Sequence, residues 1–492
     1  MNPNDPDVSL VDGIRKGTYI VHGRDGHSYH YNRTMKGGRL SLECINYRKR
    51  CRGRASVDAR GQHFRQTQRH NHAPNWNLLH ERRLRAAIMD RCRSGDDKCL
   101  HTIYDEERLK LRTPRAAAAN IPFPKLLPSM QRARNSKLPP LPHTLTELDL
   151  LLRDPRYSFL TKTLDGEDCI YAGAYGLSAN RTRCLIFISK RMLLYLRTRK
   201  LLLCDGTFHI VPNNLGCSQI WNLVTIRRHH VIPIGSIFMQ SQLTECYRAA
   251  ITAIKLLLPG YEPKEIMCDF ENSQQKALSI EFPIAQRRGC HFHFTKANLL
   301  HAKEMGLAVL IQDDGVCDSI MRCLCAIPLL HADFIIDGVL EMAEYTQRSG
   351  RWNQLGPFFD YIERTWLRPS RLPILSVYKC EHRTSNACES YHHALNVAMG
   401  QLAHPNVYKV LSALVRLEDR YVQDLVVLKS GRQSTRNRKM SSICNDEIIK
   451  GLTAELEEEE ISIHSFLRKA SRRLQSLYNE VLGLVLAPHP VG

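Results

Sequence analysis

Two short apolar runs, each ending in an aspartate, place the strongest constraint on the fold of this chain. The first is Leu201-Leu202-Leu203-Cys204-Asp205 and the second is Ile266-Met267-Cys268-Asp269. A continuous apolar run between polar residues is typical of a central strand that is buried on both faces of a sheet. We therefore expect two central strands, with the carboxylate that ends each strand at the edge of the sheet rather than in its core.

The residues between and after these runs predict an alternation of strands and helices. Strand-like runs cover 220–226, 231–238 and 284–290, and helical patterns cover 244–258 and 273–280. The predicted order is β-β-β-α-β-α-β, with an acid at the end of the first and of the fourth strand. This order resembles the ribonuclease H-like arrangement, in which those two strands are neighbours, so that Asp205 and Asp269 would lie side by side.

A pair of neighbouring carboxylates can bind divalent cations. The two charges repel each other unless a cation lies between them. Hard oxygen ligands suit Mg²⁺ or Mn²⁺, and two such ions can activate a nucleophile and stabilise a leaving 3′-oxygen. Taken singly, an Asp after an apolar strand is also common as a turn or helix cap, and that interpretation stays open for each acid alone.

A second constellation, near the N-terminus, has the ligand types of a metal site. Cys44, Cys51, His70 and His72 form the pattern C-x6-C-x18-H-x-H. On an extended strand, residues two apart face the same side, so one strand would offer both imidazoles to one ion. Two thiolates and two imidazoles complete a tetrahedral structural Zn²⁺ site. The alternative is two buried thiols and two surface histidines, in a chain with 22 histidines.

The region around these ligands resembles the FLYWCH-type zinc finger over residues 14–76. Residues 16–76 have no helical period and predict short antiparallel strands. The residues that carry the resemblance are Gly17, Tyr29, Tyr31, Cys44, Cys51, Arg54, Ala55, His70 and His72. Leu42 stands where that family usually has Trp. The resemblance implies a small zinc-bound β module that binds DNA or protein.

Four motifs in the second half resemble the Mutator-like element (MULE) transposase domain, over about residues 185–400. They are Leu203-Cys204-Asp205-Gly206-Thr207-Phe208, Cys268-Asp269-Phe270-Glu271, Cys290-His291-Phe292-His293-Phe294 and Arg383-Thr384-Ser385-Asn386-Ala387-Cys388-Glu389-Ser390. That family has a DDE triad on a ribonuclease H-like core, with a helical insertion that we place at about 300–380. The resemblance implies that Asp205, Asp269 and Glu389 are the triad and bind Mg²⁺ or Mn²⁺. Ser385 stands where the family more often has Asn.

Two assignments within this resemblance keep alternatives. Glu389 lies on a predicted helix, 386–397, and Glu271 and Glu381 are the competing third acids. Cys290 and His293 match the family's C-x2-H pair and share a face of one helical turn. They could form a structural contact, bind a metal ion or contact DNA.

The charge distribution indicates a polyanionic partner. The chain has 69 Lys and Arg against 49 Asp and Glu, a net charge of +20, and residues 1–140 carry +15 of it. The densest basic run comprises Arg48, Lys49, Arg50, Arg52 and Arg54, and a second patch lies at 432–439. Such patches bind nucleic acid through phosphate neutralisation, so we expect double-stranded DNA as the partner and the nucleus as the location. A solvated surface is the alternative.

Length and composition exclude several classes of protein. A chain of 492 residues predicts roughly two to four domains. The hydrophobic fraction of 43% and the charged fraction of 24% are those of a globular chain. The sequence lacks a signal-peptide pattern at its start and an apolar run of about 18 residues, so we expect no membrane partner. Seventeen cysteines without a secretory signal favour reduced thiols over a disulfide framework.

These expectations combine into a multidomain α/β protein with four parts. They are the zinc finger at 14–76, a basic helical region with a Pro-rich linker at 77–143, the transposase domain at 185–400, and a helical tail at 401–492. The predicted function is a DNA transposase, or a domesticated derivative, that binds terminal repeats and cuts and joins DNA. The alternative is a non-catalytic DNA-binding regulator derived from a transposase. The amphipathic stretch 446–486 could form a homo-oligomer or pack within its own chain.

Overall fold

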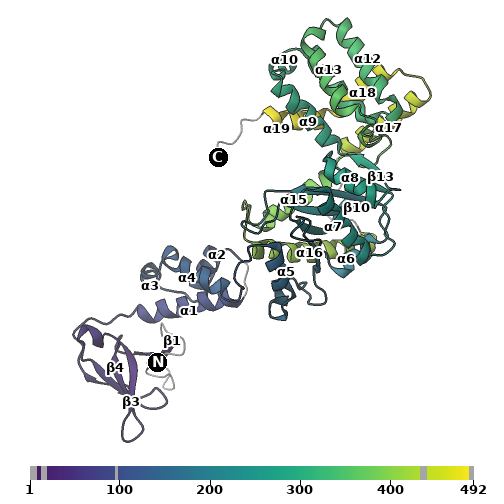
Figure 1. The fold of residues 1–492 in the computed structure, drawn as a ribbon. Coiled ribbons are helices and arrows are strands. Elements are labelled where there is room, and N and C mark those ends of the chain that lie inside the picture. Colours follow the sequence, from purple (N-terminus) through teal and green to yellow (C-terminus); the bar gives the residue numbers. More distant parts are fainter. Residues whose placement is uncertain (1–7, 13–18, 95–97, 433–439, 487–492) are drawn as a thin grey trace. The chain divides into compact units, whose positions relative to one another are not determined.

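The computed structural model describes residues 8–12, 19–94, 98–432 and 440–486. The chain divides into two compact units, Met1–Pro139 and Pro140–Gly492 (Figure 1). The start of the predicted finger, including Gly17, and most of the basic patch at 432–439 lie outside the described residues.

The first unit opens with a six-stranded antiparallel sheet in which each strand pairs with the next along the chain. The strands are β1 Val8–Asp12, β2 Tyr19–Gly23, β3 Ser28–Thr34, β4 Leu40–Cys44, β5 Arg54–Val57 and β6 Arg65–Gln68. The predicted antiparallel strands are therefore confirmed. Tyr29, Leu42 and Phe64 lie in the small core of this sheet, so Leu42 is a buried packing residue.

Four helices complete the first unit and bury a second core. They are α1 Leu78–Ser94, α2 Leu100–Lys110, α3 Arg115–Asn120 and α4 Phe123–Asn135. The helices expected within 77–143 are present, and α3 and α4 extend them through most of the proline-containing part. Pro124 lies in the first turn of α4, where a helix tolerates proline, and Leu126 and Met130 hold α4 in the core.

The second unit contains a mixed seven-stranded sheet in the order β13-β12-β9-β10-β11-β8-β7. Its strands are β7 Tyr171–Tyr175, β8 Cys184–Phe187, β9 Leu201–Thr207, β10 Gln219–Arg227, β11 His230–Met239, β12 Glu265–Cys268 and β13 Gln286–Gly289. β9, β12 and β13 are mutually parallel, and the other pairs are antiparallel. The sheet begins at Tyr171, upstream of the boundary at 185 that the sequence predicted.

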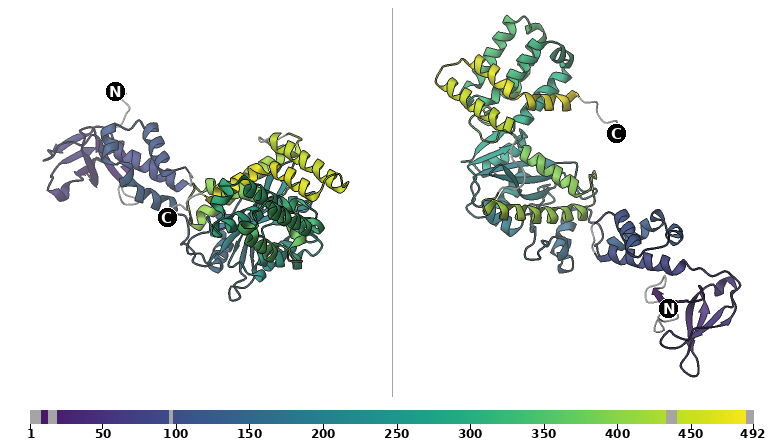
Figure 2. Two further views of the ribbon diagram at one scale, coloured as in Figure 1. Left: turned by 90° about the horizontal axis from the view of Figure 1, so that it is seen from above. Right: turned by 180° about the vertical axis from the view of Figure 1, so that it is seen from behind.

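Helices cover both faces of this sheet. Those within and around it are α5 Leu145–Arg153, α6 Lys190–Leu196, α7 Thr244–Leu257, α8 Asn272–Glu281, α15 Asn386–Ala398 and α16 Val407–Lys429. The predicted order β-β-β-α-β-α-β over 201–290 is confirmed. Leu202, Cys204 and Ile266 point into the core shared with α7 and α8. Because side chains alternate along a strand, Asp205 points to the opposite face, against which α15 packs (Figure 2).

A helical part, inserted between β13 and α15, adjoins the sheet. It comprises α9 His291–Glu304, α10 Ala308–Asp313, α11 Gly315–Ala326, α12 Ile335–Arg348, α13 Trp352–Trp366 and α14 Leu372–Leu375. The last helices are α17 Met440–Glu457, α18 Ile463–Arg473 and α19 Gln475–Leu486. α18 packs on α11 and α12, and α19 packs on α9. The predicted helical tail at 401–492 is therefore divided, because α16 packs on the sheet while α18 and α19 pack on the inserted helices.

Candidate functional site

Asp205 lies inside its strand rather than at the strand's end, which corrects the sequence-based expectation. β9 continues to Thr207 because β10 pairs with it past the point where β12 stops, and Asp205 is the cross-strand partner of Asn222. The Asp205 side chain is buried, with 6% exposure. Asn222 is a neighbour that sequence reasoning missed. Its amide oxygen accepts a hydrogen bond from Ser236, whose hydroxyl lies 3.3 Å from that of Tyr391 on α15.

The three parallel strands bring Asp205, Asp269 and Cys290 into one row. Leu201, Glu265 and Gln286 are paired in register across β9, β12 and β13. Four residues after each of them come Asp205, within β9, and Asp269 and Cys290, which directly follow the ends of β12 and β13. The backbone N–H of Cys290 donates to the carbonyl of Cys268 (2.9 Å). The expectation that the two aspartates lie on neighbouring strands is confirmed.

The chain turns sharply after Asp269 and holds that residue in place. The Glu271 N–H donates to Asp269 Oδ1 (2.7 Å), and Gln275 donates to the Asp269 carbonyl (2.8 Å). The ring of Phe270 lies against Gly289, where a Cβ atom would come within 2.1 Å of it. Only glycine allows this approach, so the turn that carries Asp269 is packed directly on β13.

Glu389 lies in the first turn of α15, on the helix that the sequence predicted. Ligand atoms of Asp205, Glu389 and His392 all lie within 4.8 Å of one another. Glu389 Oε1 is 3.9 Å from His293 Nε2, and its Oε2 is 3.8 Å from His392 Nδ1. His392 sits one turn after Glu389, and that i, i+3 spacing is the sequence signal that points to it.

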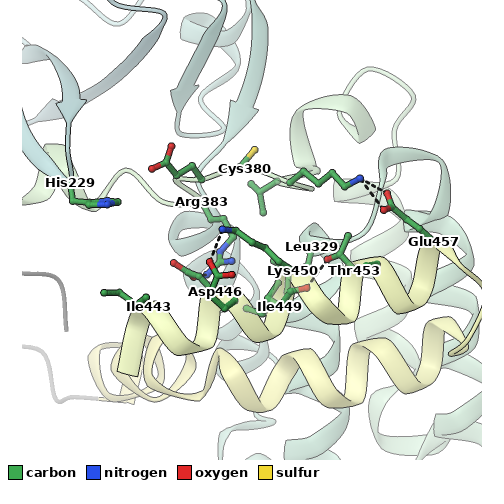
Figure 3. Close-up of a pocket in the computed structure, with 15 residues that line it drawn as sticks. His229, Leu329, Cys380, Arg383, Ile443, Asp446, Ile449, Lys450, Thr453 and Glu457 are labelled. Atoms are coloured by element: carbon green, nitrogen blue, oxygen red, sulfur yellow. Dashed lines mark hydrogen bonds and ion pairs between the residues drawn. The ribbon is translucent and has the colours of Figure 1, made fainter. Parts of the chain in front are cut away.

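The two competing glutamates are placed differently. Glu271 lies just before α8 and accepts a hydrogen bond from the Tyr247 hydroxyl (2.8 Å). Glu381 is exposed and lines a pocket of about 730 Å³ beside α17. Arg383 and Asp446 face each other in that pocket and form an ion pair (Figure 3). Among the described residues, the group formed by Asp205, Glu389 and His392 includes neither competitor, and it does not include Asp269 either.

Burial and charge shift the pKa values of the site in opposite directions. Burial raises the pKa of Asp205 to about 6, although His392 and His293 counteract it. For His293, burial would lower the pKa, but Cys290, Asp205 and Asp269 outweigh it and raise the pKa to about 9. The neighbouring His392 and His293 lower the pKa of Glu389 despite partial burial. The site therefore favours a cation beside its carboxylates.

Cys290 and His293 flank the carboxylates without joining a metal cluster. The buried Cys290 Sγ accepts hydrogen bonds from the Ser385 N–H (3.1 Å) and the Ser385 hydroxyl (3.2 Å). Burial would raise the pKa of Cys290, but His293 and Ser385 outweigh it and lower that pKa. Among the described residues, neither Cys290 nor His293 belongs to a group of three or more metal-ligating side chains.

The acidic cluster fits a hard divalent cation. Asp205 and Glu389 supply carboxylate oxygens, the ligands that Mg²⁺ and Mn²⁺ prefer, and His392 supplies an imidazole nitrogen. Asp269, the predicted second acid, is outside this group. The His392 Nε2 atom is buried and has no hydrogen-bond partner within the described part of the chain. A polar atom left in this state beside the buried Asp205 and the exposed Glu389 is a feature expected of a site that takes up a further polar group or ion.

The N-terminal ligand set forms a second cluster. Ligand atoms of Cys44, Cys51, His70 and His72 all lie within 4.8 Å of one another. The expectation that both histidines lie on a strand is wrong, because β6 ends at Gln68 and the two imidazoles lie in the loop that follows. That loop folds back toward β4, which brings His72 Nε2 to 3.3 Å from Cys44 Sγ.

Hydrogen bonds around this cluster orient both imidazoles. Tyr29 donates its hydroxyl to Asp25 Oδ2 (2.5 Å), so its oxygen accepts from His70 Nε2 (2.9 Å). His70 Nδ1 is then free to act as a ligand and lies 3.5 Å from Cys51 Sγ. His72 Nδ1 donates to the Ala73 carbonyl (2.9 Å), which leaves His72 Nε2 as its ligand atom. Such outer partners are typical of metal-binding histidines.

Backbone N–H groups contact both cysteine sulfurs of this cluster. The N–H groups of Asn46 and Gly53 each point at the cysteine sulfur two residues earlier, at 3.4 Å. A hydrogen bond to sulfur stabilises a thiolate. Two thiolates and two imidazoles are the ligand chemistry of a tetrahedral metal site.

The predicted basic residues lie next to this cluster on the surface. Arg48 and Lys49 lie in a 3₁₀ turn, Tyr47–Lys49, between the two cysteines. Arg48, Lys49, Arg50, Arg52 and Arg54 are all exposed. Arg54 is 3.7 Å from Glu43, an exposed ion pair of little energetic weight. The segment offers several cations to a polyanion.

Comparison with known proteins gives one family. Residues 201–297 match the family model of the MULE transposase domain. The match includes Asp205, Asp269, Cys290 and His293 and ends before Glu389. No curated protein matches the chain. The domain indicates a transposase-related function, which implies contact with DNA. Within the described part of the chain, every helix is too short or too polar to cross a membrane.

Proposed function

We propose that the second unit is a DDE-type transposase domain with a ribonuclease H-like core, active or recently derived from an active enzyme. One observation carries the proposal: Asp205 lies on β9, Asp269 directly follows the neighbouring parallel strand β12, and α15 brings Glu389 and His392 to Asp205. The match of residues 201–297 to the MULE transposase domain supports the same chemistry. The reactions would be cleavage and strand transfer of double-stranded DNA.

Asp205, Asp269 and Glu389 would hold Mg²⁺ or Mn²⁺ in this proposal. When bound, the metal supplies positive charge to the attacking and leaving oxygens of a phosphodiester. Asp205 is held by its buried strand position, and Asp269 by its turn on β13. His293 remains charged at neutral pH because its pKa is raised to about 9 despite burial, so it would add positive charge where a phosphate approaches.

The first unit would bind the DNA to be cut. We assign Cys44, Cys51, His70 and His72 to a structural Zn²⁺ ion in a FLYWCH-like module. The thin core of this sheet supports that assignment, because small β modules need such a staple. Arg48, Lys49, Arg50, Arg52 and Arg54 would neutralise DNA phosphates at the terminal repeats.

Nicking of a labelled duplex that carries the sequences flanking the gene tests the function. Full-length protein should cut that duplex in Mg²⁺ or Mn²⁺ and should leave a duplex of scrambled sequence intact. A protein that binds the flanking duplex yet never cuts it in either metal would instead be a DNA-binding regulator derived from a transposase.

A further inference from the structure

Cys290 and Ser385 form a contact between two parts of the chain that are far apart in sequence. Cys290 ends the row of Asp205 and Asp269 and directly precedes α9. Ser385 directly precedes α15, the helix that carries Glu389. The whole helical insertion lies between them. Two hydrogen bonds, from the N–H and the hydroxyl of Ser385, reach Cys290 Sγ.

The Ser385 hydroxyl does not cap the helix that it precedes. A serine at the N-cap of a helix normally accepts a hydrogen bond from an N–H of the first turn. Ser385 makes no such bond to α15 and donates to Cys290 instead. Ser385 is 1% exposed and Cys290 is fully buried. A buried sulfur that lost these donors would keep only its interaction with His293, because water cannot reach it.

Two further contacts run along the same seam between the starts of α9 and α15. The His291 N–H donates to the Arg383 carbonyl (3.0 Å). His293 Nε2 lies 3.9 Å from Glu389 Oε1. The starts of the two helices are therefore joined at three points, and the Cys290–Ser385 contact is the fully buried one.

We infer that Cys290 and Ser385 are a positioning pair that sets the place of Glu389 relative to Asp205 and Asp269. Glu389 arrives on a helix that follows a long insertion, so its position depends on a contact with the strand ends. Cys290 supplies that contact from the aspartate row itself. The inference rests on the proposed function, since it concerns the same divalent-metal site.

The other two roles open to Cys290 fit the structure less well. A DNA contact requires accessibility, and Cys290 has none. A metal ligand requires partners, and the metal-ligating groups among the described residues do not include Cys290. A sulfur that accepts two hydrogen bonds from one serine is instead engaged within the protein.

Mn²⁺ binding to the full-length, zinc-loaded protein tests the inference, with free Mn²⁺ followed by electron paramagnetic resonance. Binding that Asp205→Asn removes is counted as this site. Cys290→Ala should raise the Mn²⁺ dissociation constant about tenfold, the effect expected when support for a ligand is lost. Ser385→Ala should raise it less, because the backbone N–H remains. Cys290→Ser keeps an acceptor and should restore most of the affinity.

A double variant and a matched control separate positioning from general damage. The Cys290→Ala/Ser385→Ala protein should bind Mn²⁺ no more weakly than Cys290→Ala alone, because both changes break one contact. Ser471→Ala removes a comparable buried contact, Cys323 Sγ to Ser471 Oγ (3.7 Å), in the helical part. It should leave Mn²⁺ affinity unchanged at a similar melting temperature.

Three outcomes would overturn the inference. Unchanged Mn²⁺ affinity in Cys290→Ala and Ser385→Ala overturns the positioning role while leaving the proposed function intact. Strictly additive losses also overturn it. Wild-type protein without any Asp205-dependent Mn²⁺ binding overturns the proposed function, and the inference with it. If Cys290→Ala fails to fold, the comparison of Ser385→Ala with Cys290→Ser and Ser471→Ala decides.

Discussion

Asp205 and Asp269 occupy equivalent register positions on adjacent parallel strands, although 63 residues separate them in the sequence. Asp205 points to the sheet face against which α15 packs, and α15 brings Glu389 to within 4.8 Å of Asp205. The acids are therefore held by three elements that the fold fixes independently. Their roles can be tested one at a time.

The identity of the third acid can be tested by comparing three glutamates. Glu389→Gln should abolish DNA nicking, because it removes the charge beside Asp205 at nearly constant size. Glu271→Gln and Glu381→Gln should retain most of the activity, since Glu271 is engaged by the Tyr247 hydroxyl and Glu381 lies exposed in the pocket beside α17. The rates are measured on one labelled duplex. Activity in Glu389→Gln together with its loss in Glu271→Gln would move the third ligand to Glu271.

The N-terminal cluster should hold one zinc ion per chain. Cys51→Ser should lower the zinc content, measured by mass spectrometry of the purified protein, because three ligands bind zinc far more weakly than four. Cys99→Ser changes an exposed cysteine of the same unit and should keep its zinc. Equal zinc content in both variants would contradict the assignment.

The hydroxyl of Tyr29 should contribute to zinc affinity through His70. Tyr29→Phe keeps the buried ring but removes the acceptor for His70 Nε2, so the zinc dissociation constant should rise about tenfold. Tyr31→Phe is the matched control, because that exposed tyrosine is hydrogen-bonded to Thr34 and lies outside the zinc cluster of the described residues. Competition with a chelator measures both. Equal affinities in the two variants would show that the hydrogen bond is unimportant.

DNA binding by the first unit should depend strongly on salt. Neutralisation of about six phosphates predicts a slope near −5 for the logarithm of the binding constant against that of the salt concentration. Replacing Arg48 and Lys49 by Gln should make the slope shallower by about two. Fluorescence anisotropy at several salt concentrations measures it. A slope that the two substitutions leave unchanged would place the DNA on another surface.

Much of the sheet was predictable from the sequence, because apolar runs identify buried strands. The order of elements over 201–290 follows from the apolar and helical patterns, and the pairing of the strands before Asp205 and Asp269 was implied by the resemblance to the ribonuclease H-like arrangement. The continuation of β9 past Asp205 was not predictable, since it depends on where β10 pairs. The position of His70 and His72 in a loop was also not predictable, because the spacing of two residues does not distinguish a strand from a folded loop.

Long-range contacts account for the remaining differences. The helices over the Pro-rich segment depend on packing of Leu126 and Met130 against α1, which outweighs the local signal of the prolines. The packing of the last helices on the insertion joins segments more than a hundred residues apart, which local sequence patterns do not indicate. The bond between Ser385 and Cys290 spans 95 residues, and only the family motifs pointed to either residue.

Cleavage by the aspartate variants tests the central claim most directly. Full-length wild type, Asp205→Asn and Asp269→Asn are compared for nicking of a duplex with the gene's flanking ends, in Mg²⁺ and in Mn²⁺, with DNA binding measured in parallel. We predict that wild type nicks the duplex, and that each variant binds DNA as well as wild type but does not cut it. Nicking at the wild-type rate by either variant would contradict the account.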